Sequence, residues 1–258
     1  MRKINYRPGM FSFNGHSSKD LGLCVTKAPD LNRPARQFNT YNIPGRNGTI
    51  IEQLDAFENV KRTYEVFAAN NDYAPISKEF TSISEWLYTA DGYCRLEDDF
   101  EPEIFRLAYF TGPLDVDNLL NLYGETEINF SCRPERFLLS GDSFIDITHN
   151  FRWNIVNPTK FTAKPFIVVE IDPEYTPSSS AYIQLTTPTG TIKVEHITKT
   201  TYIDCEGMRV YTNTEEKNSD VTGIFPTIPS GEQSIELIKT GFDLSKIKIQ
   251  LKPRWYTI

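Results

Sequence analysis

Several patterns that would identify a common class of protein are missing from this 258-residue chain. No apolar run approaches the roughly 18 residues that a membrane-spanning helix needs. The N-terminus carries positive charge but no apolar stretch behind it, which does not match a secretory signal. We therefore expect a protein that is folded in the cytoplasm and does not insert into membranes.

Clustered cysteines are also missing. The four cysteines have no CxxC pair and are spread over the whole chain: Cys24, Cys94, Cys132 and Cys205. Metal sites and small disulfide scaffolds both need cysteines close together. The spacing predicts four buried, reduced thiols.

The chain lacks an excess of basic residues. It has 27 Lys and Arg against 34 Asp and Glu, a net charge of −7. Most of the acidic excess lies in residues 1–137, with 15 basic and 20 acidic side chains. A protein that grips nucleic acid needs a surplus of cations to displace counterions, so the composition argues against specific DNA or RNA binding.

Catalytic motifs are absent as well: there is no GxSxG, P-loop or GxGxxG segment. The histidines, His16, His149 and His196, do not form an i, i+4 pair. Residues 97–103 gather five carboxylates, but neighbours in sequence need not face each other across a substrate. We interpret this run as a solvated acidic turn, with calcium binding as a weaker alternative. The sequence predicts no enzyme, no cofactor and no metal site.

Strand patterns dominate the first half of the chain. Short alternating segments are expected at the ranges 10–13, 21–25, 37–43, 93–96, 104–110 and 125–132. Val60, Arg62, Tyr64 and Val66 share one face of a further strand. A single helix is predicted from Phe80, Ile83 and Leu87, with a Ser82–Glu85 capping box and a stop at Gly92. Together these features predict an α+β domain in which the helix covers a sheet.

The pattern pauses around 133–136, and only short strands separated by turn residues follow. They are expected at 166–171, 181–186, 191–197, 201–204, 209–211, 234–238 and 247–251. Such spacing is typical of a β-sandwich or jelly roll. The predicted fold is therefore mainly β, with an N-terminal domain at 1–137 and a C-terminal sandwich at 138–258. The segment 246–256 is free to pack on either domain.

Aromatic residues are frequent in the second half and leave an alternative function open. They include Trp153, Tyr175, Tyr182, Tyr202, Tyr211 and Phe225. These rings either fill the sandwich core and its edges or form a platform that stacks on sugars. The alternative to a structural protein is thus a carbohydrate-binding or receptor-binding module.

An ordered set of short motifs resembles a known family. FNG at 13–15 is followed by SKDLGL at 18–23, RPAR at 33–36 and IPGRNG at 43–48. This order is similar to the N-terminal signature of the distal tail proteins of those siphophages that infect Gram-positive bacteria. The resemblance is good over about 8–137 and looser beyond, where 203–204 and 226–231 are similar to the family's C-terminal domain.

The resemblance implies a structural hub at the distal end of a phage tail, assembled in the host cytoplasm. Members of the family form hexameric rings between the tail tube and the tail-tip or baseplate proteins. Their N-terminal domains build the ring, and their galectin-like C-terminal domains project outward. The implied partners are copies of the chain, the major tail protein, the tail-associated tip protein and receptor-binding proteins, while DNA passes through the lumen without specific binding.

One loop is our candidate for the contact between subunits. It consists of Pro44, Gly45, Arg46, Asn47 and Gly48, followed by a long alternating strand. This arrangement indicates a hairpin arm able to reach a neighbouring copy. An acidic N-terminal half also suits a DNA conduit, because acidic walls repel phosphate.

Overall fold

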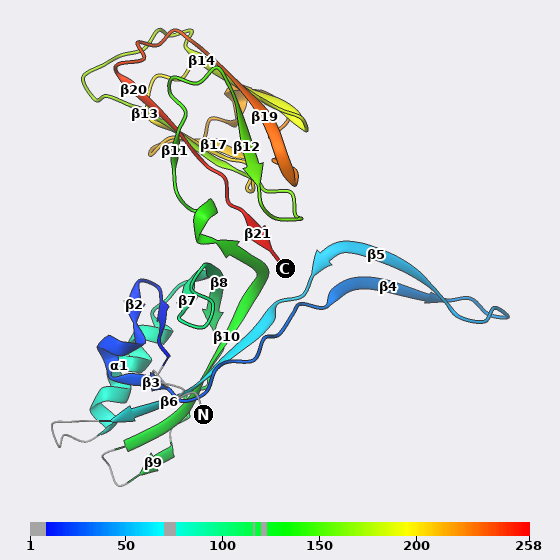
Figure 1. Cartoon of the computed structure of the whole chain (residues 1–258), viewed down its shortest axis with the longest axis vertical. Helices are drawn as coiled ribbons and strands as arrows, with labels where there is room; N and C mark the ends of the chain where they lie inside the picture. The colour runs from blue at the N-terminus through cyan, green and yellow to red at the C-terminus, as the bar shows by residue number, and fades with distance from the viewer. Residues whose placement is uncertain (1–8, 70–75, 116, 120–122) are drawn as a thin grey trace, which may run out of the picture. The chain divides into compact units, whose positions relative to one another are not determined.

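The computed structural model describes residues 9–69, 76–115, 117–119 and 123–258. These residues fall into two compact units that divide between Arg136 and Phe137 (Figure 1). That the two units are separate domains, with a ring-forming role for the first, stays a prediction. The architecture is mainly β, as the sequence predicts.

The first unit is built on one antiparallel sheet with the strand order β2-β1-β7-β8-β10-β6-β3, and β9 pairs beside β10. Its elements are β1 (Phe11–Phe13), β2 (His16–Ser17), η1 (Ser18–Leu21), β3 (Leu23–Val25), β4 (Arg36–Asn42), β5 (Thr49–Phe57), β6 (Val60–Ala69), α1 (Ile76–Tyr88), β7 (Cys94–Asp98), β8 (Ile104–Phe110), β9 (Asp117–Leu119) and β10 (Tyr123–Leu138). The face predicted for β6 is confirmed, because Arg62, Tyr64 and Val66 are all buried.

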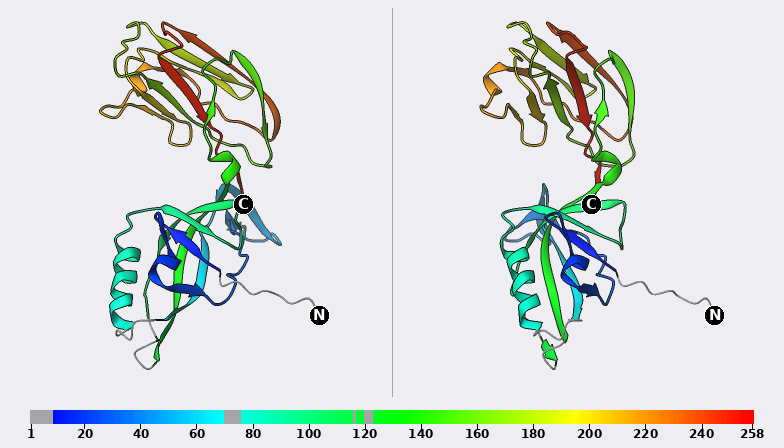
Figure 2. Two further views of the ribbon diagram at one scale, coloured as in Figure 1. Left: turned by 60° about the vertical axis from the view of Figure 1, so that its left-hand side comes forward. Right: turned by 90° about the vertical axis from the view of Figure 1, so that its left-hand side faces the viewer.

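Helix α1 covers one face of this sheet (Figure 2). Phe80, Ile83 and Leu87 are buried in the core, as their spacing predicts. Trp86 joins them and donates a hydrogen bond from Nε1 to the carbonyl oxygen of Phe13, at 3.0 Å. The predicted capping box is wrong, because the helix begins at Ile76 and Ser82 lies inside it. The S-x-x-E motif also occurs within helices. It therefore indicates a helix N-terminus only where the apolar stripe of the helix begins at the same place.

The predicted pause at 133–136 is also wrong, since β10 runs through it without a break. Charged residues replace the apolar alternation in this part of the strand. Arg136 pairs with Glu101, and Arg133 lies 3.2 Å from Glu135. A pattern based on hydrophobic residues cannot detect a strand segment made of charged residues.

The second unit is a sandwich of two five-stranded sheets, ordered β11-β20-β13-β16-β17 and β12-β19-β14-β15-β18. Its elements are η2 (Leu139–Gly141), β11 (Ile145–Asp146), β12 (Arg152–Asn157), β13 (Phe166–Ile171), β14 (Tyr182–Thr187), β15 (Gly190–Val194), β16 (Thr201–Asp204), β17 (Arg209–Tyr211), η3 (Asn218–Asp220), β18 (Val221–Gly223), β19 (Gly231–Thr240), β20 (Ile247–Lys252) and β21 (Tyr256–Thr257). The segment 246–256 belongs to the second unit: it contains β20, which joins the sandwich, and ends in β21, which pairs with β10.

Side chains from both sheets fill the sandwich core. Ile167 and Val169 of one sheet meet Leu185 and Leu237 of the other within a single buried cluster. Period-two burial along β14 and β20 explains why the sequence pattern located these strands. No helix in the described part of the chain is long and apolar enough to span a membrane.

A lysine ties one loop to the sandwich. Lys239 on β19 donates from Nζ to the carbonyl oxygens of Thr148 and Asn150, at 2.7 and 2.8 Å. Burial lowers the pKa of this amine. We expect Lys239→Met to reduce the free energy of unfolding by about 1–3 kcal/mol, because both carbonyls lose their charged donor. Urea denaturation tests this, with Lys248→Met on exposed surface as the matched control; equal stability of the two variants would contradict it.

Candidate interaction surfaces

A long hairpin stands outside the main sheet. Strands β4 and β5 form a two-stranded sheet of their own and pair with no other described strand (Figure 1). Their register joins Thr40 to Ile51 and Tyr41 to Ile50, with one irregularity between Arg36 and Phe38. At about 3.3 Å per residue, the nine residues of β5 give the hairpin a length of roughly 30 Å. The hairpin arm predicted from the sequence therefore exists as a structural element.

The five candidate residues, Pro44, Gly45, Arg46, Asn47 and Gly48, form the exposed tip of this hairpin. The amide of Arg46 donates to the carbonyl oxygen of Ile43, at 3.1 Å, which closes a four-residue turn. Proline at the second position and glycine at the third, with φ +81°, are typical of a type II turn. The structure brings these residues together, and their role at a subunit contact stays a prediction.

Turn chemistry predicts a local effect at the tip. Gly45→Ala places a side chain at a left-handed φ, which costs about 1 kcal/mol. Because the hairpin lies outside the core, we expect roughly fivefold faster amide exchange in β4 and β5 and an unchanged main sheet. Hydrogen-exchange mass spectrometry measures both. Asn47→Ala is the control, since Asn47 has no positive φ. Equal amide-exchange rates in the two variants would contradict the assignment of a type II turn at the tip.

The hairpin carries large apolar side chains on both of its faces. Phe38 and Ile51 are diagonal neighbours on one face and are 55% and 65% exposed. Tyr41 and Ile50 pair directly on the other face and are 50% and 39% exposed. A two-stranded ribbon is marginal in water without a surface to pack on. Apolar side chains on both sides therefore mark the hairpin as an interaction surface. The sequence analysis named the tip and did not single out these four residues.

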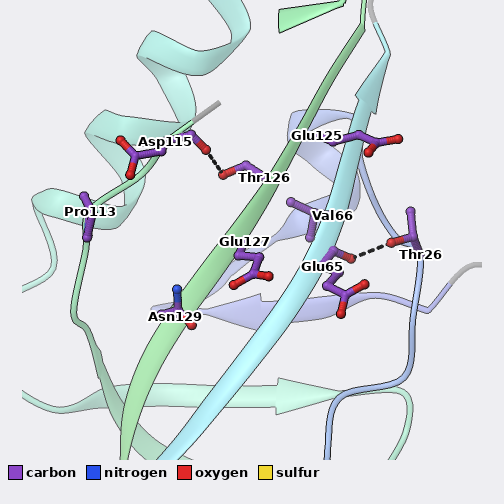
Figure 3. A pocket seen from close by; sticks show the side chains of 9 residues that line it. All are labelled: Thr26, Glu65, Val66, Pro113, Asp115, Glu125, Thr126, Glu127 and Asn129. Atoms are coloured by element: carbon purple, nitrogen blue, oxygen red, sulfur yellow. Dashed lines mark hydrogen bonds between the residues drawn. The ribbon is translucent and has the colours of Figure 1, made fainter. Parts of the chain in front are cut away.

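A second surface is acidic and concave. It has a volume of about 500 Å³ and lies over β6 and β10 (Figure 3). Its lining residues are Thr26, Glu65, Val66, Pro113, Asp115, Glu125, Thr126, Glu127 and Asn129. Register places Glu127 directly opposite Glu65 on the outer face of the sheet. Lys27 pairs with Glu65 at 2.8 Å, and no ion pair joins Asp115, Glu125 or Glu127 to a cation of the described residues. This face is strongly negative.

The acidic run 97–103 differs from its prediction, because part of it is buried. Asp98 is fully enclosed, and its Oδ2 accepts from Arg62 Nη2 and from the Tyr64 hydroxyl, both at 2.7 Å. Its Oδ1 accepts from the amides of Phe100 and Glu101, at 3.0 and 2.9 Å. Asp98 thus fixes the turn after β7, and it is not a solvated side chain.

Glu101 extends this network to two further arginines, Arg106 and Arg136. Three guanidinium groups therefore surround two carboxylates inside the first unit. Burial alone would raise the pKa of Asp98, but the Tyr64 hydrogen bond and the charge of Arg62 hold it below its ordinary value. Burial alone would also raise the pKa of Glu101, but the hydrogen bond from Arg106 and the charge of Arg106 outweigh burial and lower this pKa. Sequence adjacency hides this cluster, because its members come from four strands and a turn.

Two of the six candidate aromatic residues, Tyr202 and Tyr211, lie in a row of stacked rings. Tyr202 stacks on Tyr211 at 5.3 Å between ring centroids and on Phe166 at 6.3 Å. Arg209 and Arg254 cover the two ends of this row, at 5.4 and 4.9 Å from the rings of Tyr211 and Phe166. Stacking on a sugar needs an open ring face, and here the faces are covered. The other four candidates pack against the core or under a cation: Trp153, Tyr175, Phe225 and Tyr182.

The cysteine prediction holds for two of four residues. Cys132 and Cys205 are buried, which raises the pKa of their thiols to about 11 and about 12. Cys94 is half-buried and Cys24 is exposed, because β3 alternates and turns Cys24 outward. Within the described residues, no group of three or more His, Cys, Asp or Glu side chains is arranged to hold a metal ion.

The histidines lie apart from one another. His16 lies on β2, His149 in a turn after β11 and His196 beyond the end of β15. His196 was expected on a strand; instead it has a φ of +53° and lies 3.5 Å from Asp220.

Comparison with known proteins identifies the architecture. Neither protein-family models nor the sequences of curated proteins gave a match. Among solved structures, the Dit protein of phage SPP1 aligns over 95% of this chain and 98% of its own, with a TM-score of 0.62 and 12% identity. The chain has the fold of a Dit hub protein. The baseplate of phage P2 contains a second match, over 95% of this chain and 98% of that one, at a TM-score of 0.50 and 11% identity.

The match covers both units of this chain. The SPP1 protein is described as a hub of the adsorption apparatus in phages that infect Gram-positive bacteria. The resemblance inferred from the motifs at 13–48 is thus confirmed at the level of the fold, across the whole chain. At this identity the likeness establishes architecture, and function requires a separate argument.

Proposed function

We propose that the chain is a non-enzymatic hub protein at the distal end of a phage tail. The observation that carries the proposal is the end-to-end match to the Dit fold, over 95% of the chain. A chance likeness of one β-sandwich would cover only the second unit. The motifs at 13–48 point to the same family independently of the structure.

The hub acts by forming a ring of identical subunits, with six copies as in the family it resembles. A closed ring needs head-to-tail contacts, in which one surface of each copy meets a different surface of the next. The β4–β5 hairpin supplies such a surface, because both of its faces carry exposed apolar side chains. Ring contacts of this permanent kind bury on the order of 2,000 Å².

Solution mass tests the proposal most directly. Light scattering coupled to size-exclusion chromatography should give six times the 29.6-kDa chain mass, or a ring whose population grows with concentration. A monomer at every concentration, together with no binding to tail-tube or tail-tip proteins, would contradict it.

The ring connects the tail tube to tail-tip, baseplate or receptor-binding proteins and is assembled before release from the host cell. These contacts need no cofactor. Their support is the Dit fold, whose SPP1 example is called a hub, and the baseplate origin of the second match.

The lumen of such a ring passes DNA without binding it. We assign the acidic face of β6 and β10 to this wall, because Glu65, Glu125 and Glu127 repel phosphate (Figure 3). Glu125→Lys with Glu127→Lys should retard DNA release from assembled particles severalfold, most strongly at low salt. Release is measured with a DNA-binding dye. Reversal of Glu232 and Glu236 in the second unit is the control, and equal rates in both would contradict the assignment.

A further inference from the structure

The second unit contains a hollow of about 390 Å³ at one end of the sandwich. Three loops surround it, after β13, between β15 and β16, and after β17. The lining residues are Ile171, Asp172, Pro173, Tyr175, Thr198, Lys199, Thr200, Thr212, Asn213 and Thr214. The volume lies within the range of small-ligand sites.

The chemistry of the lining is neutral and rich in hydroxyl groups. Four threonines and one asparagine supply donors and acceptors, and Ile171, Pro173 and Tyr175 supply an apolar side. The one carboxylate, Asp172, is paired with Lys246 at 3.1 Å. The one cation, Lys199, lies 3.9 Å from Glu215. With both charges balanced, the hollow suits an uncharged ligand with many hydroxyl groups.

Two polar side chains at the rim are uncommitted. The exposed amide of Asn213 and the exposed hydroxyl of Thr198 have no hydrogen-bond partner among the described residues. In contrast, the neighbouring Thr212 hydroxyl accepts from the amides of Thr214 and Glu215, at 3.3 and 3.2 Å. The rim thus presents free groups on a backbone that is already ordered.

The walls are held in place by the sandwich. The amide of Ile171 donates to the Thr200 hydroxyl at 3.1 Å, which joins the end of β13 to the β15–β16 loop. The Tyr175 hydroxyl accepts from the amide of Asp243 at 2.7 Å, and the amide of Tyr175 donates to the carbonyl oxygen of Asp172 at 2.9 Å. A preorganised site loses little entropy when a ligand binds.

We propose that this hollow binds a neutral saccharide, of one or two hexose or N-acetylhexosamine rings. The hydroxyl groups of the sugar bond to Asn213 and Thr198, while its C–H face packs on Pro173. This site is distinct from the row of stacked rings around Tyr202, whose faces are covered. The proposal does not depend on ring assembly by the first unit.

Saturation-transfer NMR on the full-length protein tests the site with glucose, galactose, mannose, N-acetylglucosamine and N-acetylgalactosamine. We expect at least one sugar to receive saturation, most strongly at its C–H protons. Asn213→Ala and Thr198→Ala should each lower the affinity for that sugar roughly tenfold, which is the effect of one lost neutral hydrogen bond. Thr222→Ala, on exposed surface of β18, should bind as the wild type does.

Two results would overturn the proposal: no transfer to any of the five sugars, or equal affinity of all three variants. Loss of folding does not confuse the outcome, because the side chains of Asn213 and Thr198 are exposed and make no hydrogen bond to the described residues. Thermal melting of each variant checks this. The mass measurement on the same samples reports ring formation separately, so either proposal can fail without the other.

Discussion

Serine substitutions at Phe38 and Ile51 should convert the assembled protein to monomers without unfolding either unit. The two side chains lie on one face of the β4–β5 hairpin and are more than half exposed in the single chain. Covering them in a neighbouring copy removes apolar surface from water, at about 25 cal/mol per Å². Losing both side chains should cost about 3 kcal/mol of binding free energy at each contact between subunits, which weakens the association constant of that contact roughly a hundredfold. A closed ring loses this binding energy at every one of its contacts.

The control removes an equally exposed apolar side chain elsewhere. Ile224 of the second unit is 66% exposed, close to the 65% of Ile51. Ile224→Ser should leave the mass by light scattering unchanged, whereas Phe38→Ser with Ile51→Ser should yield the single-chain mass. If the hairpin variant kept the full mass, another surface would build the ring and the hairpin assignment would be wrong.

The hairpin also shows how far sequence patterns reach. Its turn was predictable, because a proline followed by a glycine between two strand-like segments is typical of a tight turn. Its isolation was not, since alternation locates a strand without saying which strand it pairs with. The apolar positions Phe38 and Ile51 look like core residues in the sequence. Only the structure shows that no element of the described chain covers them.

Within the sandwich, strand positions were largely predictable. Strands β13, β16 and β17 have the predicted bounds, because β16 and β17 alternate in burial and β13 is a short apolar run with three consecutive buried residues. Strand β12 was missed, since its polar–apolar alternation breaks at the end, where Val156 faces solvent and Asn157 is buried. Edge strands bury less and leave a weaker pattern.

The buried charge cluster was the largest miss. Residues 97–103 contain the carboxylates of a solvated turn, and nothing local shows that Asp98 points inward. Its partners, Arg62 and Tyr64, lie more than 30 positions away on β6. Their place on the buried face of β6 was predicted from periodicity. A buried arginine needs a buried acid, so the prediction of an inward Arg62 already implied a partner such as Asp98.

Asp98→Asn should destabilise the first unit by about 3–5 kcal/mol, because it leaves buried arginine charge unpaired. Each carboxylate oxygen of Asp98 accepts two hydrogen bonds, one pair from Arg62 and Tyr64 and one from backbone amides. An asparagine in either orientation presents its NH₂ group to one of these pairs of donors. Asp99→Asn is the control at the next position; its exposed carboxylate accepts one amide, from Met10 at 3.2 Å, so the loss should be about 1 kcal/mol or less.

The same substitution has a signature in pH. The folded-state pKa of Asp98 is held below its ordinary value, while an unfolded aspartate titrates near about 3.9. Its contribution to stability is therefore complete above about pH 4 and is lost as the pH falls through the folded-state pKa. The stability gap between wild type and Asp98→Asn should be widest at neutral pH and should narrow below about pH 4. Urea denaturation, followed by hydrogen exchange of the β6 and β10 amides, measures the gap in the first unit alone. A gap that stayed constant down to pH 2 would mean that the cluster is held by packing and that its charges contribute nothing.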